Sequence, residues 1–104
     1  MMRVTTHPGE VLREEFMIPL GVSINKLAGD LDIAISRVSN IVNGQRAVTA
    51  DTALRLAIYF KTTPEFWLNL QSAYDLSRLR AERGNAIIQA VRMPKNDQTV
   101  PVSA

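Results

Sequence analysis

The sequence contains no cysteine and only one histidine, His7. Without cysteine the chain cannot form disulfides, thiolate metal sites or cysteine nucleophiles. A single histidine beside Pro8 cannot build a zinc site from histidine and cysteine, and any serine–histidine pair would have to use it. Glu14 and Glu15 are neighbours on a predicted helix, so their side chains point in different directions and do not make a working carboxylate pair. No group of residues supports an enzyme, and we expect neither a metal nor another cofactor.

Long apolar runs are also missing. No run approaches the roughly 20 residues that a membrane-spanning helix needs, and the first residues lack the apolar stretch of a secretory signal, so we expect a cytoplasmic protein. A hydrophobic share of 46% and a charged share of 21% are ordinary for a folded chain. With 104 residues the chain can bury one core but hardly two. We predict one domain over residues 1–84 and a partly flexible extension over residues 85–104.

Strong charge of one sign is absent too, because the net charge is only +2. Overall charge therefore does not point to nucleic acid, but the distribution of charge is more informative. Residues 34–50 carry Arg37 and Arg46 and no acidic residue, whereas several acidic residues precede this segment. A basic, acid-free segment suits an anionic partner.

What the sequence does contain is a series of helix start and stop signals, which predict an all-α fold. Pro8 suits the first position of a helix that ends near Ile18, because Pro19 disfavours helical geometry in the residue before it. Ser23, Thr49 and Thr63 are good N-caps for later helices. The five helices are expected from Pro8 to about Ile18, over residues 24–31, over residues 35–43, over residues 50–60, and from Pro64 to a point before Gly84.

Two apolar groups in the later helices bear on the core. Leu54 and Ile58 widen the apolar stripe of the helix over residues 50–60, which suggests burial on two sides. Phe66 and Trp67 could form an exposed aromatic patch, but aromatic residues at helical spacing are more often core, and we predict core for both.

The helices over residues 24–31 and 35–43 have the pattern of a helix-turn-helix. Their apolar positions allow two short helices to bury their faces against each other across a tight turn, and the small Ala28 permits a close approach. Asp32 occupies a turn position where φ tends to be positive, a conformation that aspartate tolerates better than most residues. Gly44 follows the second helix, where a left-handed C-cap is needed.

If the second of these helices is a recognition helix, its outward side chains have the chemistry to contact base edges. Arg37 can donate two hydrogen bonds to guanine, Asn40 can pair with adenine, and Ile35 can touch a thymine methyl group. The segment that follows, with the start of the next helix, is better suited to phosphates. The predicted DNA-binding residues are Ile35, Ser36, Arg37, Ser39, Asn40 and Asn43 on the helix and Gln45, Arg46 and Thr49 after it.

The alternative is a polar-faced helix in an ordinary bundle, with Ser36, Ser39 and Asn40 in contact with water only. Serine and asparagine are mediocre helix formers, and a surface selected only for solubility would more often carry glutamate, lysine or alanine. The composition of this face therefore favours DNA binding.

A palindromic DNA site needs two recognition helices roughly 34 Å apart, so the protein must make a symmetric contact with a second copy. The last helix and the following segment remain after the first four helices have closed the core. The predicted dimer residues are Leu70, Tyr74, Leu79, Ile87 and Ile88. Ile87 and Ile88 either join this contact or lie in a frayed segment after the last helix.

Three blocks of sequence resemble the HigA-type antitoxins, a branch of the lambda-repressor-like helix-turn-helix regulators. The blocks are residues 7–14, which read HPGEVLRE, residues 38–44, which read VSNIVNG, and residues 63–76 with TPEFWLNLQ and YDL. Together they span about residues 7–80. The helix-turn-helix alone is a broad signal, and the flanking blocks narrow the match.

The resemblance implies a homodimer that neutralises a HigB-type toxin, a ribosome-dependent mRNA endonuclease, and that represses its own operon. It also implies DNA-reading positions, which fall here on Ala34, Ser36, Arg37, Ser39 and Asn40. Ala34 departs from the hydroxyl or proline-type residue that is common there. Residues 85–104 lie outside the resemblance.

Two other functions stay open at this point. A stand-alone regulator would lack a toxin partner, and a small basic reading frame directly beside this one would argue against it. A pure interaction protein would have a helix-turn-helix that no longer binds DNA, and substitutions at Arg37 and Asn40 would then leave DNA binding unchanged.

Overall fold

The computed structural model describes residues 4–94, and every regular element among them is a helix. The first three elements, α1 (Pro8–Val11), the π-helical η1 (Leu12–Met17) and α2 (Ile18–Leu20), run on without a break and form one rod, here called the first rod. The others are α3 (Ile24–Leu31), α4 (Ile35–Val42), α5 (Ala50–Phe60) and α6 (Pro64–Ala90). The predicted five-helix, all-α architecture is therefore confirmed.

The first rod passes the position where we expected it to end. The backbone N–H of Ile18 donates to the carbonyl of Arg13, five residues back, so the hydrogen-bond register widens just before Pro19. Pro19 has no N–H to donate, and the change of register lets the helix continue over it for one more turn. The rod ends instead at Gly21, whose φ of 65° is left-handed.

The predicted N-caps are present. The hydroxyl oxygens of Ser23, Thr49 and Thr63 accept hydrogen bonds from the backbone N–H groups three residues later, at the starts of α3, α5 and α6. Pro8 occupies the first turn of α1, and the cap there is His7, whose Nδ1 accepts from the N–H of Gly9 at 2.8 Å. Helices α1, α3, α5 and α6 therefore each start where a local side chain satisfies one of the first amides.

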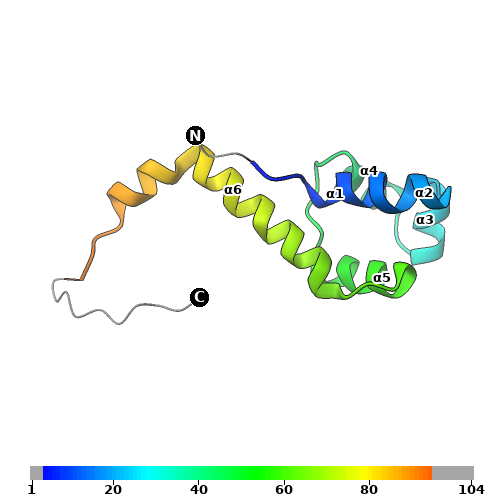
Figure 1. The fold of residues 1–104 in the computed structure, drawn as a ribbon. Helices are drawn as coiled ribbons and strands as arrows, with labels where there is room; N and C mark the ends of the chain where they lie inside the picture. The colour runs from blue at the N-terminus through cyan, green and yellow to red at the C-terminus, as the bar shows by residue number, and fades with distance from the viewer. Residues whose placement is uncertain (1–3, 95–104) are drawn as a thin grey trace.

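The core lies between the first rod, α3, α4, α5 and the first turns of α6, which together form the body in Figure 1. Ala28 is buried where α3 packs against α4, and Trp67 is fully buried at the start of α6. The remaining large buried hydrophobic residues are Leu12, Met17, Leu27, Leu31, Val38, Ile41, Val48 and Leu56.

Two predictions about the core are wrong. The side chains of Leu54 and Ile58 are 54% and 74% exposed, because α5 is covered on one face only and these residues lie on the other. Phe66 is 38% exposed, although its ring meets Phe16 and Trp67 edge-on. The sequence pattern shows that α5 has a broad apolar stripe. How much of that stripe other helices cover depends on the tertiary structure.

The last helix is longer than predicted. It continues through Gly84 to Ala90, so the expected end before Gly84 is wrong. Gly84 does not adopt a positive φ, unlike Gly21 and Gly44, and therefore does not act as a cap. A glycine inside a helix costs about 1 kcal/mol, which good helix formers around it can outweigh. The division of the chain at residue 84 stays a prediction, and residues 95–104 of the predicted extension lie outside the described residues.

Figure 1 shows that the C-terminal half of α6 projects away from the body. The chain before α1 follows this helix for a short distance, where the N–H of Thr5 donates to Ser77 Oγ at 3.0 Å. The principal dimensions of 56 × 25 × 22 Å reflect the projecting helix. The body therefore carries the helix-turn-helix, and α6 carries a separate surface.

Candidate nucleic-acid interface

The turn between α3 and α4 has the backbone that a helix-turn-helix requires. Asp32 ends α3 with a φ of 57°, in the left-handed region, as the sequence predicted. The N–H of Asp32 donates to Gly29 O at 3.2 Å, and the N–H of Ile33 donates to Ala28 O at 3.1 Å. These bonds satisfy the last carbonyls of α3 while the chain reverses toward α4.

The recognition-helix candidate α4 buries one face and presents the other. Val38 and Ile41 are almost fully buried, whereas the side chain of Ile35 is 53% exposed. Ser36 and Asn43 are exposed, and Ser39 and Asn40 are half-buried. The predicted outward polar face is thus confirmed as a surface, and α4 carries no acidic residue.

Ala34 caps α4 without a side-chain hydrogen bond. Its backbone is extended, with φ of −64° and ψ of 142°, and its carbonyl accepts from the N–H of Arg37 at 3.0 Å. Alanine stands here in place of a residue with a capping hydroxyl, so the first amides of α4 have no local side-chain partner. Amides in this position are suited to an anionic oxygen from outside.

The segment after α4 folds back on the same helix. Gly44 has a φ of 75°, and the N–H of Gln45 donates to Asn40 O at 2.8 Å. Gln45 and Arg46 are exposed, which suits the phosphate contacts predicted for them. Thr49 is also exposed, but its hydroxyl accepts from the N–H of Thr52 as the cap of α5.

Arg37 is not a simple outward-facing arginine. Its Nη1 donates to Asp51 Oδ2 at 2.9 Å and makes a longer contact of 3.4 Å with Thr52 Oγ1, so α4 is tied to the first turn of α5. The same carboxylate oxygen accepts from Arg55 Nε at 2.9 Å. Hydrogen bonds from Arg55 and then from Arg37 hold the pKa of Asp51 below its ordinary value.

Sequence reasoning missed Asp51 and Arg55. Arg55 Nη1 also donates to the carbonyl of Leu31 at 2.8 Å, which is at the C-terminal end of α3. The only local signal was the i, i+4 spacing of an acid and an arginine at the start of a predicted helix. Their contacts with Arg37 and with α3 join residues 14 to 24 positions apart, and no local pattern reveals such contacts.

Another junction lies at the start of α1. The imidazole of His7 meets the ring of Tyr74 edge-on with 4.8 Å between ring centroids, which connects the start of α1 to α6. Partial burial lowers the pKa of His7 from its ordinary value of 6.5, and the negative charge of Asp75 opposes this shift. Protonation at Nδ1 would also remove the acceptor that caps α1.

We therefore expect folding stability to fall as the pH drops below about 6.5. The unfolded chain binds a proton at His7 more readily than the folded one does, so the folded state is fully favoured only above that pH. Thermal unfolding between pH 8 and pH 5 would measure the loss. In His7→Asn an amide oxygen can replace the acceptor without titrating, so a pH dependence equal to that of the wild type would contradict the assignment.

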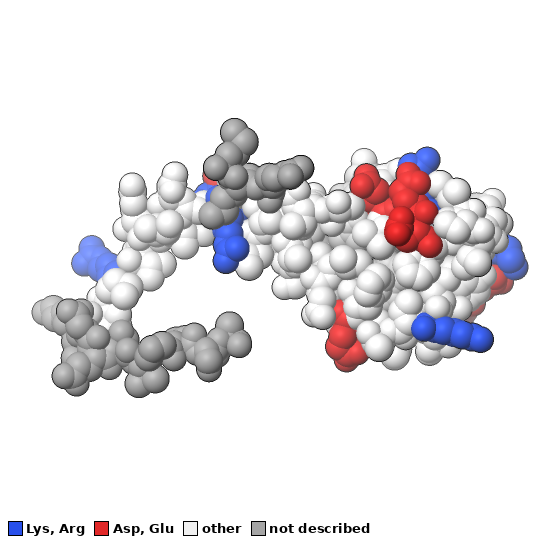
Figure 2. Space-filling view, in the orientation of Figure 1, with Lys and Arg blue, Asp and Glu red and all other residues white. Residues whose placement is uncertain are grey.

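Several acidic side chains gather away from α4. Figure 2 shows a group of them over the first rod. Glu10, Glu14 and Glu15 line a shallow groove there, together with Phe66 and Leu70 of α6. The acids that precede residue 34 in the sequence are thus partly collected on a surface of their own, and α4 remains free of them.

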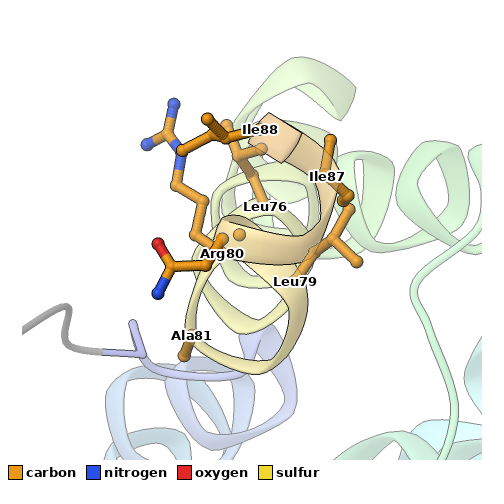
Figure 3. A pocket seen from close by; sticks show the side chains of 8 residues that line it. Leu76, Leu79, Arg80, Ala81, Ile87 and Ile88 are labelled. Atoms are coloured by element: carbon orange, nitrogen blue, oxygen red, sulfur yellow. The ribbon is translucent and has the colours of Figure 1, made fainter. Parts of the chain in front are cut away.

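The five predicted dimer residues fall into two groups. Leu70 packs against the core and Tyr74 against His7, so both are half-buried within the protomer. Leu79 and Ile88 are 43% and 74% exposed, and with the half-buried Ile87 they line a hollow on the projecting part of α6. Figure 3 shows these side chains beside Leu76 and Arg80. This hollow is here called the α6 face, and its residues are Leu76, Leu79, Arg80, Ala81, Gly84, Asn85, Ile87 and Ile88.

The described part of the chain lacks two further classes of site. Over residues 4–94 there is no group of three or more histidine, cysteine, aspartate or glutamate side chains placed to hold a metal ion. No helix among the same residues is long and apolar enough to cross a membrane.

Comparison with known proteins agrees with this geometry. A family model described as "Helix-turn-helix" matches residues 12–67, from the first rod to the start of α6. Virulence-associated protein I of Dichelobacter nodosus is 49% identical over 77 residues, which cover 74% of this chain and 71% of that protein. An addiction module antidote protein of a HigA family from Coxiella burnetii is 50% identical, with a TM-score of 0.82 and coverage of 89% of this chain and 100% of that one. Pseudomonas aeruginosa antitoxin HigA, solved with the higBA promoter, is 41% identical, with a TM-score of 0.82 and coverage of 86% and 97%.

The fold and the presented face of α4 define a helix-turn-helix protein of the DNA-binding class. Within that class, the chain belongs to the HigA-type antitoxins, because the identity to solved members is high and extends over almost their whole length. The family implied by the three sequence blocks is therefore confirmed.

Proposed function

We propose that this chain is the antitoxin of a toxin–antitoxin pair and represses its own operon by binding operator DNA as a symmetric dimer. The observation that carries the proposal is the outward, acid-free polar face of α4, held on a helix-turn-helix. A relative that is 41% identical has been solved with promoter DNA, which supports the same activity here.

In this proposal α4 enters the major groove. Arg37 donates to a guanine, Asn40 pairs with an adenine, and Ile35 contacts a thymine methyl group, while Ser36, Ser39 and Asn43 add hydrogen bonds at base edges. Gln45, Arg46 and the N-terminal ends of α4 and α5, at Ala34 and Thr49, bind phosphates. Phosphate contacts set the position of the protein, and base contacts set its sequence preference.

The second copy docks through the α6 face. This surface exposes several large apolar side chains at the end of a helix that projects from the body, and such a surface is costly to leave in water. Leu79, Ile87 and Ile88 make the contact, whereas Leu70 and Tyr74 support it from within each protomer. A palindromic site requires the two-fold axis of this contact to place two copies of α4 on successive major grooves.

The toxin partner is of the HigB type, a small mRNA endonuclease. Membership of the HigA-type antitoxins supports this partner, and both roles would be exercised in the cytoplasm. The runner-up function, a stand-alone regulator, is favoured only if no toxin gene adjoins this one.

Footprinting on the protein's own promoter, with and without the product of the adjacent gene, tests the proposal. We expect protection of a palindromic site by this chain alone and a change in that protection when the toxin is added. Absence of any protected site would reject the repressor, whereas protection that an adjacent gene product never alters would favour the stand-alone regulator.

Arg37→Ala and Asn40→Ala should each weaken operator binding by about 1–3 kcal/mol, because each removes a bidentate contact with a base. Binding to random DNA should weaken much less. Titrations of operator and random duplexes at one salt concentration would measure both. Asn69→Ala, which alters an equally polar but exposed residue on α6, is the control. Equal and negligible effects on both duplexes would favour a protein that no longer reads DNA.

Ile88→Lys should shift the protein from dimer to monomer and weaken operator binding at least about tenfold, because it places a charge in an apolar contact. Sedimentation and duplex titration would measure the two effects. Ile58→Lys is a matched control, since Ile58 and Ile88 are both 74% exposed but lie on different helices. If the two variants behave alike, the α6 face is not the dimer contact.

A further inference from the structure

We propose that Asp51 is a positioning residue that determines DNA specificity by fixing the guanidinium of Arg37. The inference rests on the proposed function, because it needs Arg37 to read a base. Asp51 lies on α5, outside the recognition helix, and touches no nucleotide in this scheme. Its effect on discrimination is transmitted through the side chain of Arg37.

The geometry of the ion pair leaves the reading edge of Arg37 available. Asp51 Oδ2 and Thr52 Oγ1 both accept from one nitrogen, Nη1. Among the described residues no hydrogen bond engages Nη2 or Nε of Arg37. A guanidinium has five N–H donors in a rigid plane, so holding one nitrogen orients the remaining donors. Those donors include the fork that guanine O6 and N7 accept.

Asp51 is itself fixed from the other side. Arg55 Nε donates to the same oxygen at 2.9 Å, and Arg55 Nη1 donates to the carbonyl of Leu31 at the end of α3. The carboxylate is therefore the centre of a network that links α3, α4 and α5. An arginine held in this way loses less conformational freedom on binding DNA than a mobile one does.

The charge of Asp51 has a second consequence for specificity. The side chain of Asp51 is 55% exposed beside the recognition helix, and that of Arg37 is 28% exposed. A carboxylate here offsets the positive charge of Arg37, so Arg37 contributes little to general attraction by phosphates. Without the carboxylate, Arg37 can turn to the nearest phosphate on any sequence. Asp51 thus favours the correct base and disfavours unspecific DNA at the same time.

The test is Asp51→Asn in the full chain, with binding to operator and to random duplexes measured over a range of salt concentrations. We expect the ratio of the two affinities to fall about tenfold, with tighter binding to random DNA and a salt dependence steeper by about one phosphate contact. A purely structural role would lower the melting temperature and leave the ratio unchanged, and this result would overturn the proposal.

Two further variants make the test specific. Asp30→Asn removes the same charge from another exposed aspartate that bridges two helices, through Tyr59 at 2.7 Å and Lys26 at 3.1 Å, so it should leave the ratio unchanged. In an Arg37→Ala background, Asp51→Asn should have no further effect on the ratio. An equal effect in that background would overturn the proposal. If the wild type itself fails to discriminate operator from random DNA, the proposed function fails instead.

Discussion

Gly9→Ala should destabilise the fold by about 3 kcal/mol or more, although it adds a single methyl group. A Cβ at Gly9 would overlap the carbonyl oxygen of Ile41 and lie 2.7 Å from its carbonyl carbon. Both atoms belong to the backbone of α4, which cannot move aside as a flexible side chain can. The first rod would have to separate from the recognition helix, so operator binding should weaken together with stability.

Urea unfolding followed by circular dichroism would measure the change, at one protein concentration because a dimer makes apparent stability depend on concentration. Gly29→Ala is the matched control. Gly29 is an exposed residue inside α3, and a Cβ there would meet no atom within 4 Å. That substitution should raise stability by about 0.5–1 kcal/mol, since alanine is the better helix former. Similar losses for both variants would show that the close approach of Gly9 to α4 is wrong.

Trp67→Ala should lower the free energy of unfolding by about 4 kcal/mol. The side chain is fully buried, its ring lies 5.1 Å from that of Phe16, and its Nε1 donates to Thr62 Oγ1 at 2.8 Å. Truncation leaves a cavity between α6 and the first rod and removes the partner of a threonine hydroxyl. A domain of this size has only about 5–15 kcal/mol of stability, so much of the variant should be unfolded at moderate temperature.

Two milder variants distinguish the cost of losing a buried side chain from the cost of losing any aromatic ring. Trp67→Phe keeps most of the volume and should cost clearly less than the alanine variant. Phe66→Ala removes a neighbouring ring that is already 38% exposed, so its cost should also be smaller. Circular dichroism is the suitable probe, because Trp67 is the only tryptophan and its substitution removes the fluorescence signal. A loss as large for Phe66→Ala as for Trp67→Ala would contradict the packing described here.

The elements of the fold could be predicted because their signals are local. A hydroxyl at Ser23, Thr49 or Thr63 satisfies amides only three residues away, and the left-handed backbone at Asp32 is a property of that residue and its turn. The outward polar face of α4 follows from helical spacing alone. For the same reason the predicted DNA-binding residues could be named before any contact between helices was known.

The end of the last helix shows where local signals fail. Gly84 is compatible with a cap, yet the helix continues through it, because a stop signal acts only when the chain leaves the helical conformation there. The prediction that α5 is buried on two faces was wrong for a related reason. Apolar residues at helical spacing indicate a face that can be buried, but the structure decides whether any element is left to cover it.

By itself the sequence determined the helix starts, the helix-turn-helix and the chemistry of the face that α4 presents, since each depends on residues a few positions apart. Only the tertiary structure decided that Arg37 is held by Asp51 and that Arg55 donates to the carbonyl at the end of α3. It also decided that Gly9 lies against the backbone of α4. These contacts join residues 14 to 32 positions apart. Their existence depends on how complete helices pack, and helix packing is set by the whole core together.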